Sequence, residues 1–545
     1  MKWEKKEREF DAIGKKFANV EKVFIYGCGY HGTGLAKKLT YCDDITGFVD
    51  IRAAEFPDGY LGKPVYHLNE FLKLCRKNLV VIVALEDYMH IIDMLTYEGF
   101  VEDENLFDYA TFPISAYYLH RCTPVIVGNT RFYVEDPQPI ASLCEKDYRL
   151  DESDDEVRII NNGIILPAKR VFCTTSEGGV CDADGIFVDG HSQRASSFTP
   201  ASPAELTVNA AYSVKDDIEY VPETVVYGGF LFNHFGHMIV ESLSRMWWYL
   251  DNCDCGYKFV FISHSTEKDM KFFEYFKLLG MREESIVLLK EPRRFDKIII
   301  PKQSMYYRDG YKHKAIKVYD VIRNSVKPAK HKNVYLTRTR LLRRDTINEE
   351  YFEDYYRNLG YEIIAPEQLT LTEQISIIAG ANNIVCVCGS LHHHILFAQN
   401  GVNITVLNKV FRRSSVFHWI NQARGAYCTF VDVHKSFLPS PQHRSCHLLM
   451  PTPHWIKYIR DCGDETVPSD VVSVDTIIEY METWAKTIIF VIREDIEIVI
   501  HNLYKKLTLA DVVKAIHDTL SAVPLDEPTK KKLYETFSHH YNSNS

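Results

Sequence analysis

Short apolar runs that fit buried strands alternate with helix-like runs in two separate parts of this 545-residue chain. In the first part, apolar runs lie at Val23–Tyr26, Ile45–Val49 and Leu79–Leu85, and a helix-like run at Leu35–Leu39 follows the first of them. The alternation returns from about residue 216 to 460, whereas residues from about 116 to 215 are rich in strand and turn signals. Strands that alternate with helices predict βαβ units and parallel sheets, so the predicted fold class is α/β.

The chain is predicted to divide into four parts. Residues 1–115 form a Rossmann-like domain, residues 116–330 a first lobe with a strand-rich start, and residues 331–460 a second lobe. Residues 461–545 form a helical C-terminal extension. Its helices are candidates for homo-oligomer formation or partner docking, and a plain stabilising role is the equal alternative.

The first part contains a glycine fingerprint in the context that it requires. The strand at Val23–Tyr26 leads directly into a turn, and a helix-like run follows. The fingerprint residues are Gly27, Gly29 and Gly32, and Asp50 ends the next strand about 20 residues later. Such glycines allow a tight turn, close approach of a pyrophosphate, and helix–strand packing, and the acid can hold a ribose hydroxyl. The alternative is a fold that keeps the turn for packing alone.

A second sequence pattern in residues 1–115 bears on the kind of nucleotide that this domain could bind. Gly47-Phe48-Val49-Asp50, followed by Gly62-Lys63-Pro64-Val65, resembles the sugar-nucleotide-binding domain that opens several bacterial polysaccharide-biosynthesis enzymes. That resemblance implies a nucleotide-sugar ligand as readily as NAD.

Composition and charge narrow the classes of function. A net charge of −10 and a pI near 6.1 argue against a dedicated nucleic-acid binder. The amino terminus lacks the apolar run of a signal peptide, and no apolar stretch is long enough for a membrane span, so a cytoplasmic location is expected, with peripheral membrane association left open. The fourteen cysteines follow no disulfide or zinc spacing, so no metal site is predicted.

Two passages of the central region carry candidate chemistry. In the first, His237, Glu241 and Arg245 follow Gly236 at helical spacing and are expected to line one helix face. A carboxylate beside an imidazole raises its basicity, so His237 can take a proton from an acceptor hydroxyl, with Glu241 as its orienter or substitute. The alternative is a surface Glu–Arg pair beside a buried histidine.

The second passage predicts a nucleotide-binding half of a Rossmann fold. A strand that begins at Asn333 leads to Arg338, and another at Asn383–Val387 leads to a turn at Gly389 and Ser390 that opens the next helix. A diphosphate is expected at this turn, and Arg338 offers it a fixed fork of donors. The alternative for Arg338 is a surface ion pair.

Together these passages resemble glycosyltransferase family 61 from about residue 170 to 410. The family pattern is matched by His237, Glu241 and Arg245 in the first lobe and by further residues in the second. Those residues are Arg338, Arg344, Asn348-Glu349, Gln374, and Gly389-Ser390 before Leu396-Phe397. The departure is Gly389-Ser390-Leu391-His392-His393-His394, where many members carry a turn richer in glycine.

The resemblance implies a GT-B-like pair of Rossmann lobes and an inverting transfer from a nucleotide-sugar donor to a hydroxyl of a glycan or glycolipid acceptor, in surface or capsular polysaccharide synthesis. His237 and Glu241 are the candidate catalytic residues. The candidates for binding substrate are Arg245, Arg338, Arg344, Asn348, Gln374, Gly389, Ser390 and His392. Three adjacent histidines cannot converge on one ion, so His392 or His393 is expected to hydrogen-bond the donor instead.

No cofactor is required for such a transfer, although the first domain can hold NAD or a nucleotide sugar. Two alternatives follow from the same residues: an NAD-dependent sugar-nucleotide oxidoreductase driven by the first domain, and a non-catalytic sugar-nucleotide-binding scaffold.

Overall fold

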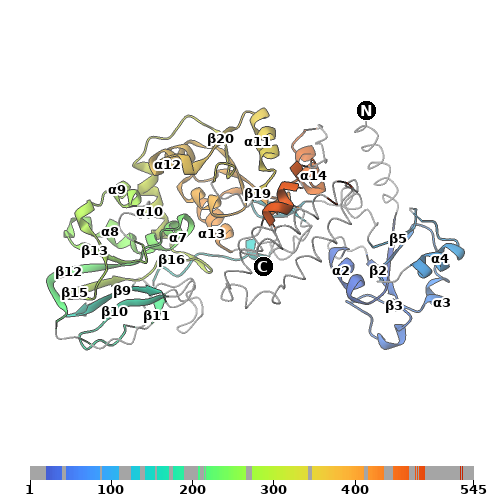
Figure 1. The fold of residues 1–545 in the computed structure, drawn as a ribbon, viewed down its shortest axis with the longest axis horizontal. Helices are drawn as coiled ribbons and strands as arrows, with labels where there is room; N and C mark the ends of the chain where they lie inside the picture. Colours follow the sequence, from blue (N-terminus) through green and yellow to red (C-terminus); the bar gives the residue numbers. More distant parts are fainter. Residues whose placement is uncertain are drawn as a thin grey trace.

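The protein is described by a computed structural model. It describes residues 20–39, 45–85, 89–102, 104–109, 124–134, 142–153, 156–170, 176–188, 207–208, 214, 217–265, 273–341, 346–409, 415–434 and 446–464, with single positions and short stretches within 473–484 and at 528 and 531. The described parts form three main sheets with helices around them (Figure 1), so the α/β fold class is confirmed. The predicted C-terminal helices lie almost entirely outside these residues.

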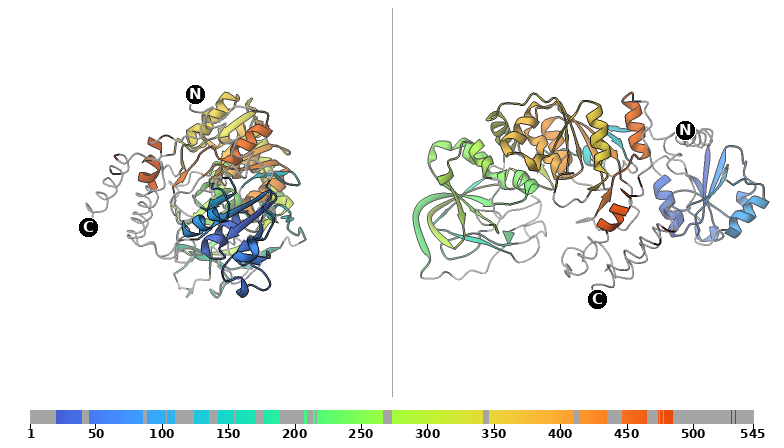
Figure 2. Two further views of the ribbon diagram at one scale, coloured as in Figure 1. Left: turned by 90° about the vertical axis from the view of Figure 1, so that its right-hand side faces the viewer. Right: turned by 45° about the horizontal axis from the view of Figure 1, so that its top comes forward.

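The N-terminal sheet has five parallel strands in the order β3-β2-β1-β4-β5 and forms a body of its own (Figure 2). Alternate residues of β1 face opposite sides: Val23 and Ile25 join a core with the helix after β1, and Phe24 and Tyr26 join a second core on the other face. The strand order reverses between β1 and β4, which is where open α/β sheets bind ligands. The elements are β1 (Lys22–Tyr26), α2 (Tyr30–Leu39), β2 (Ile45–Val49), η2 (Ala53–Glu55), β3 (Val65–Tyr66), α3 (Leu68–Phe71), β4 (Leu79–Val83), α4 (Met89–Tyr97) and β5 (Leu106–Asp108).

The first large sheet is mixed, with a parallel half in the order β15-β12-β13-β14 and an antiparallel half beside β15. Its strands are β8 (Val157–Asn161), β9 (Ile164–Arg170), β10 (Ser176–Cys181), β11 (Thr207–Val208), β12 (Glu219–Phe230), β13 (Lys258–Ile262), β14 (Ile286–Leu289) and β15 (Arg293–Pro301). The helices are α7 (Phe235–Val240), η3 (Ser242–Arg245), α8 (Trp247–Asp251), η4 (Cys253–Cys255), α9 (Glu274–Leu278) and η6 (Glu283–Ser285). The hairpin β16 (Met305–Tyr306) and β17 (Gly310–Tyr311) and helix α10 (His313–Asn324) lead on to the second large sheet.

The second large sheet has the order β20-β18-β21-β22-β23-β7-β6, and only β6 runs antiparallel. Its strands are β18 (Asn333–Leu336), β20 (Glu362–Ile364), β21 (Asn383–Val387), β22 (Asn403–Asn408) and β23 (Tyr427–Asp432), joined by β6 (Val125–Val127) and β7 (Thr130–Tyr133). The helices are α11 (Glu349–Asn358), η7 (Pro366–Gln368), α12 (Leu371–Gly380), η8 (Ser390–Phe397), α13 (Ser415–Arg424) and α14 (Pro453–Asp461), and β19 (Thr346–Ile347) pairs with β24 (His447–Leu448).

The sheets differ from the predicted division at one hairpin. Residues 125–133 were assigned to the first lobe, but β7 pairs in parallel with β23 and extends the second sheet. The stacked rings of Phe132 and Phe430, with centroids 5.5 Å apart, help to hold this pairing. The second lobe is therefore completed by a segment that lies some 200 residues before its first strand.

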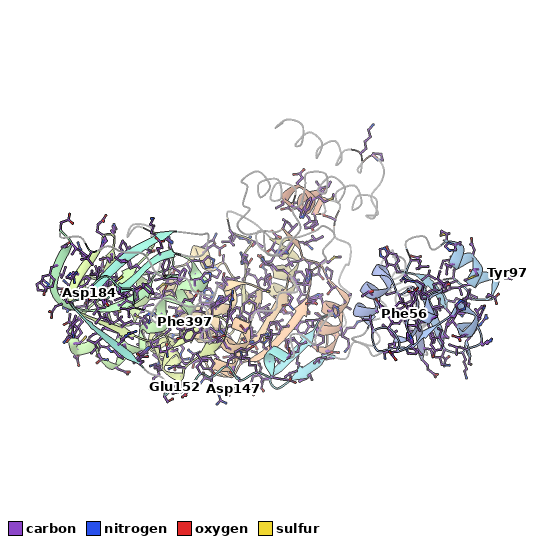
Figure 3. The ribbon with its side chains drawn as sticks, turned by 90° about the horizontal axis from the view of Figure 1, so that it is seen from below. Phe56, Tyr97, Asp147, Glu152, Asp184 and Phe397 are labelled. Carbon is purple, nitrogen blue, oxygen red and sulfur yellow. The ribbon has the colours of Figure 1, made fainter. Side chains whose placement is uncertain are left out.

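The two large sheets share one hydrophobic core. It includes Met238 of α7 and Phe276 of α9 beside the first sheet, and Ile378 of α12 and Ile404 of β22 from the second lobe. Phe397 lies between the two sheets (Figure 3), where its ring stacks on Tyr275 of α9 at 5.6 Å. Within the described residues, no helix is long and apolar enough to cross a bilayer.

Candidate active site between the two large sheets

His237 and Glu241 lie next to each other at the end of α7. Nδ1 of His237 contacts a carboxylate oxygen of Glu241. The Glu241 side chain is 1% exposed, whereas that of His237 is 41% exposed, so a buried carboxylate holds an accessible imidazole. A carboxylate accepts hydrogen bonds, so in the neutral ring Nδ1 carries the hydrogen and Nε2 carries the lone pair. The pair has the geometry of a general base with its orienter.

The predicted single helix through Arg245 is wrong. Helix α7 ends at Glu241, whose φ of −127° and ψ of −49° break the helix before η3 begins. The hydroxyl of Ser242 accepts from the N–H of Phe232 and donates to the carbonyl of Phe230, each at 3.0 Å, which ties the break to the end of β12. The chain therefore turns inward at this point.

The inward turn buries Arg245 instead of aligning it with His237. Arg245 is 1% exposed, donates to the carbonyl oxygen of Pro301, and has its guanidinium 5.7 Å from the ring centroid of Tyr227. Burial lowers its pKa. These contacts give Arg245 a packing role beneath the first sheet and correct the expectation that it binds substrate from the helix face of His237.

In the second lobe, Arg338 and Gly389 lie together where β18 and β21 end. A Cβ added at Gly389 would lie 3.0 Å from Nη1 of Arg338, and the φ of Gly389 is +153°, so both space and conformation favour glycine there. The N–H of Arg338 donates to a carboxylate oxygen of Glu349 at 3.1 Å, which fixes the turn after β18. A guanidinium therefore covers the turn that leads into η8.

The two lobes meet at this turn. A Cβ added at Gly236 would lie 3.1 Å from Cε1 of His393 and 3.3 Å from Cβ of Ser390. The ring centroid of His234, which precedes α7, lies 5.0 Å from that of His237, and desolvation first, and then the charges of His237 and Arg338, lower the pKa of His234. The structure thus brings His237 and Glu241 to the same place as Arg338, Gly389 and Ser390.

Two other residues that were predicted to bind substrate make structural hydrogen bonds. Asn348 adopts a left-handed conformation before α11 and donates to the carbonyl of Leu449 at 2.9 Å. Gln374 donates to the carbonyls of Pro366 and Leu369, and its Oε1 lies 3.0 Å from Nε2 of His394, so its amide holds the loop before α12. Arg344 lies outside the described residues.

His392 does not lie where it was expected. It is fully buried, its ring centroid is 4.7 Å from that of Phe417, and burial lowers its pKa to about 3. It therefore packs against α13 inside the second lobe. The neighbouring His393 lies against Gly236 in its place.

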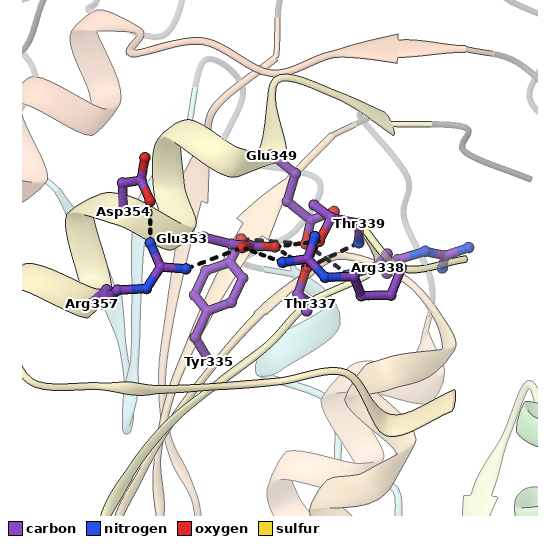
Figure 4. Close-up of polar contacts among 9 residues, drawn as sticks. Tyr335, Thr337, Arg338, Thr339, Glu349, Glu353, Asp354 and Arg357 are labelled. Atoms are coloured by element: carbon purple, nitrogen blue, oxygen red, sulfur yellow. Dashed lines mark hydrogen bonds and ion pairs between the residues drawn. The ribbon is translucent and has the colours of Figure 1, made fainter. Parts of the chain in front are cut away.

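A buried pair of carboxylates supports the turn after β18 (Figure 4): Glu349, which matched the family pattern without an assigned role, and Glu353, which the sequence did not single out. Glu353 accepts from the hydroxyls of Thr337 and Thr339 and pairs with Arg340 and Arg357 at 3.7 and 3.5 Å. Glu349 is fully buried, and burial raises its pKa to about 7. The signal in the sequence was the i, i+4 spacing of two acids at the start of α11, which is ordinary on exposed helices.

A cavity of about 420 Å³ lies beside this network, at the outer edge of the second sheet. Thr337 and Arg340, which flank Arg338 in sequence, line it. The other lining residues are Arg357, Tyr361, Glu362, Ile363, Ala365 and Gln368.

The glycine fingerprint of the N-terminal sheet forms a tight turn. A Cβ at Gly32 would lie 1.9 Å from the carbonyl oxygen of Gly27, so Gly32 is required for packing, while nothing lies within 4 Å of a Cβ at Gly29. Asp50 accepts four hydrogen bonds, one from the N–H of Cys28 and three from Arg52. A carboxylate has about four acceptor sites, so a ribose hydroxyl must displace Arg52 to reach Asp50.

A comparison with models of known protein families shows which family this region resembles. A family model for glycosyltransferase 61 matches residues 235–405. Residues 235–405 thus match the glycosyltransferase 61 family. The matched region begins at α7 and ends in β22, so it contains His237, Glu241, Arg338 and Gly389 and leaves out the N-terminal sheet. A search of curated proteins gave no match.

Proposed function

We propose that the protein is an inverting glycosyltransferase that moves a sugar from a nucleotide-sugar donor to a hydroxyl of a glycan or glycolipid. The observation that carries the proposal is the meeting of the two lobes: Gly236, next to His237, lies against Ser390, and Arg338 covers Gly389. The two large sheets then act as the lobes of a GT-B arrangement, with the acceptor beside α7 and the donor over the ends of β18 and β21.

In the proposed reaction, Nε2 of His237 takes the proton of the acceptor hydroxyl. The acceptor oxygen bonds to the anomeric carbon from the face opposite the leaving group, so the configuration inverts. The bond between the anomeric carbon and the phosphate oxygen breaks, and the nucleoside diphosphate leaves with the electron pair. Glu241 stabilises the imidazolium that forms, because its buried carboxylate lies at Nδ1.

The leaving diphosphate needs positive charge and N–H donors. Arg338 supplies a guanidinium, and the turn at Gly389 and Ser390 lets a phosphate approach the backbone closely. The cavity lined by Thr337 and Arg340, which lie within two residues of Arg338 in sequence, supports a place there for the nucleoside.

The wider biological setting is also part of the proposal. We infer a role in surface or capsular polysaccharide synthesis at the cytoplasmic side of a membrane, because the N-terminal sheet resembles sugar-nucleotide-binding domains of such enzymes. In this view the N-terminal domain holds a nucleotide sugar, with Arg52 beside Asp50 as the residue that must move or bind the ligand.

The decisive test measures sugar release by the full chain from a panel of UDP-, GDP- and CMP-sugars. His237→Ala is expected to slow turnover by about 10²–10⁴-fold, the usual contribution of a general base. His331→Ala is the matched control, because His331 is 40% exposed and pairs with Glu362 at 3.3 Å but lies away from α7. Full turnover by His237→Ala would contradict the assignment of the base, and no turnover of any donor by the native chain would contradict the function.

A further inference from the structure

Within the described part of the chain, one ring nitrogen of His393 has a hydrogen-bond partner and the other has none. The residue is 4% exposed, and Nδ1 lies 2.9 Å from the carbonyl oxygen of Ser390. Among the described residues, none hydrogen-bonds to its Nε2, although that atom is buried. A buried polar atom without a partner is uncommon in native proteins and calls for an explanation.

The contact with Ser390 fixes which nitrogen carries hydrogen. A carbonyl oxygen only accepts, so Nδ1 must donate to it. Burial first, and then the neighbouring histidines His237, His394 and His234, lower the pKa of His393 to about 3, so the ring is neutral near pH 7. In a neutral imidazole with hydrogen on Nδ1, Nε2 is an acceptor. The partner that fits this atom is therefore a donor.

The ring stands at the meeting point of the lobes. Its Cε1, which is bonded to both nitrogens, would lie 3.1 Å from a Cβ at Gly236, next to His237. The Cε1–Nδ1 edge of the ring therefore lies against the first turn of α7, and Nε2 is one bond further from it. The neighbouring histidines do not share this position: His392 packs on Phe417, and both nitrogens of His394 contact protein oxygens, those of Leu391 and Gln374.

We propose that Nε2 of His393 accepts a hydrogen bond from a sugar hydroxyl bound between the two lobes. This deepens the proposed function, on which it rests. The partner is a hydroxyl and not the diphosphate, because a phosphate oxygen ionised at neutral pH offers no hydrogen to an acceptor nitrogen. The hydroxyl belongs either to the donor sugar or to the acceptor glycan, which share this chemistry.

The test compares His393→Asn with His393→Gln in the full chain. The Asn amide nitrogen can replace Nδ1 toward the carbonyl of Ser390, but Asn has no atom at the position of Nε2. Gln can place its amide oxygen near that position and restore the acceptor. His394→Asn is the matched control, because it makes the same truncation one residue later, where Nδ1 also lies 3.0 Å from a carbonyl, that of Leu391.

The measured quantities are the Kd of the nucleotide sugar that turns over fastest in the panel, the Kd of its nucleoside diphosphate, and the KM of the glycan acceptor. His393→Asn is expected to weaken sugar-nucleotide binding on the order of tenfold while leaving the nucleoside diphosphate unchanged, with partial recovery in His393→Gln. A rise in acceptor KM alone would support the proposal with the acceptor hydroxyl as the partner.

Two outcomes overturn the proposal. One is equal weakening of the nucleotide sugar and the nucleoside diphosphate, and the other is no change in any of the three constants. If His394→Asn shifts the ratio of the two Kd values as much as His393→Asn, the effect is general to η8 and the proposal also fails. Turnover by the native chain in the same assays separates these failures from failure of the proposed function.

Discussion

Glu349→Gln should change the pH dependence of stability by an amount that follows from the site. Glu349 is fully buried, and one carboxylate oxygen accepts from the N–H of Arg338 at 3.1 Å and from the hydroxyl of Tyr335 at 3.4 Å. Burial raises its pKa from 4.5 to about 7 despite the opposing effects of Arg338 and Lys409. The amide oxygen of Gln can keep both hydrogen bonds and cannot titrate.

The direction in which stability changes with pH depends on whether the folded or the unfolded state holds the proton of Glu349. Between pH 4.5 and about 7 the folded state keeps a proton on Glu349 that the unfolded state has lost, so the native protein loses stability as the pH rises through this window. A shift of about 2.5 pKa units corresponds to on the order of 3 kcal/mol at pH 7.5. The glutamine introduced by Glu349→Gln does not titrate, so the variant does not lose this stability. Its stability relative to the native protein should therefore rise by that amount between pH 4.5 and 7.5.

The assay is urea unfolding followed by tryptophan fluorescence, because Trp455 belongs to the same hydrophobic cluster as Tyr335, whose hydroxyl donates to Glu349. Glu367→Gln in η7 is the control, since Glu367 is exposed and its change should not depend on pH in this way. A difference between Glu349→Gln and the native protein that stays constant from pH 4.5 to 7.5 would refute the reasoning.

Three further predictions test other parts of the molecule. Glu241→Gln should lower kcat by about 10²–10³-fold with little change in donor affinity, which steady-state kinetics and calorimetry would separate; equal loss of affinity would place Glu241 in donor binding. Arg338→Ala should weaken nucleoside diphosphate binding by at least about tenfold in calorimetry, with Arg293→Ala as a control at an exposed ion pair; unchanged affinity would count against the donor site. Asp50→Ala should destabilise the N-terminal domain by about 1.5–3 kcal/mol, because the N–H of Cys28 loses a charged acceptor, and limited proteolysis would detect the change; resistance equal to that of the native chain would show that the turn holds without Asp50.

The sequence predicted the local features of the fold and the family correctly. The predicted strand at Ile45–Val49 has the same bounds in β2, and the pattern of Thr370 followed by Glu373 three residues later, typical of a capping box, opens α12. Both depend on residues within one turn or one strand, where the period of apolar positions and the capping chemistry decide the outcome. The turn at Gly389 was found for the same reason, because it follows a buried strand directly.

The features that failed depend on contacts between distant segments. Helical spacing placed Arg245 beside His237, but the hydroxyl of Ser242 ties the chain to β12, and the helix breaks at Glu241. Likewise, nothing within residues 125–133 indicates that they pair with β23. Whether His392 or His393 faces the other lobe is decided by the 3₁₀ geometry of η8, which the local sequence does not specify.

The same distant contacts explain how the candidate site is held together. Glu274 of α9 accepts hydrogen bonds from the N–H groups of Leu371 and Thr372 at 3.3 and 3.2 Å, so a first-lobe carboxylate caps a second-lobe helix. Phe397, which ends η8, stacks on Tyr275 within the core common to both lobes. A wide opening of the lobes would expose this apolar core and leave the first N–H groups of α12 without acceptors. The relative position of His237 and Arg338 is therefore set by folding, and a donor diphosphate would meet a guanidinium and a base that are already in place.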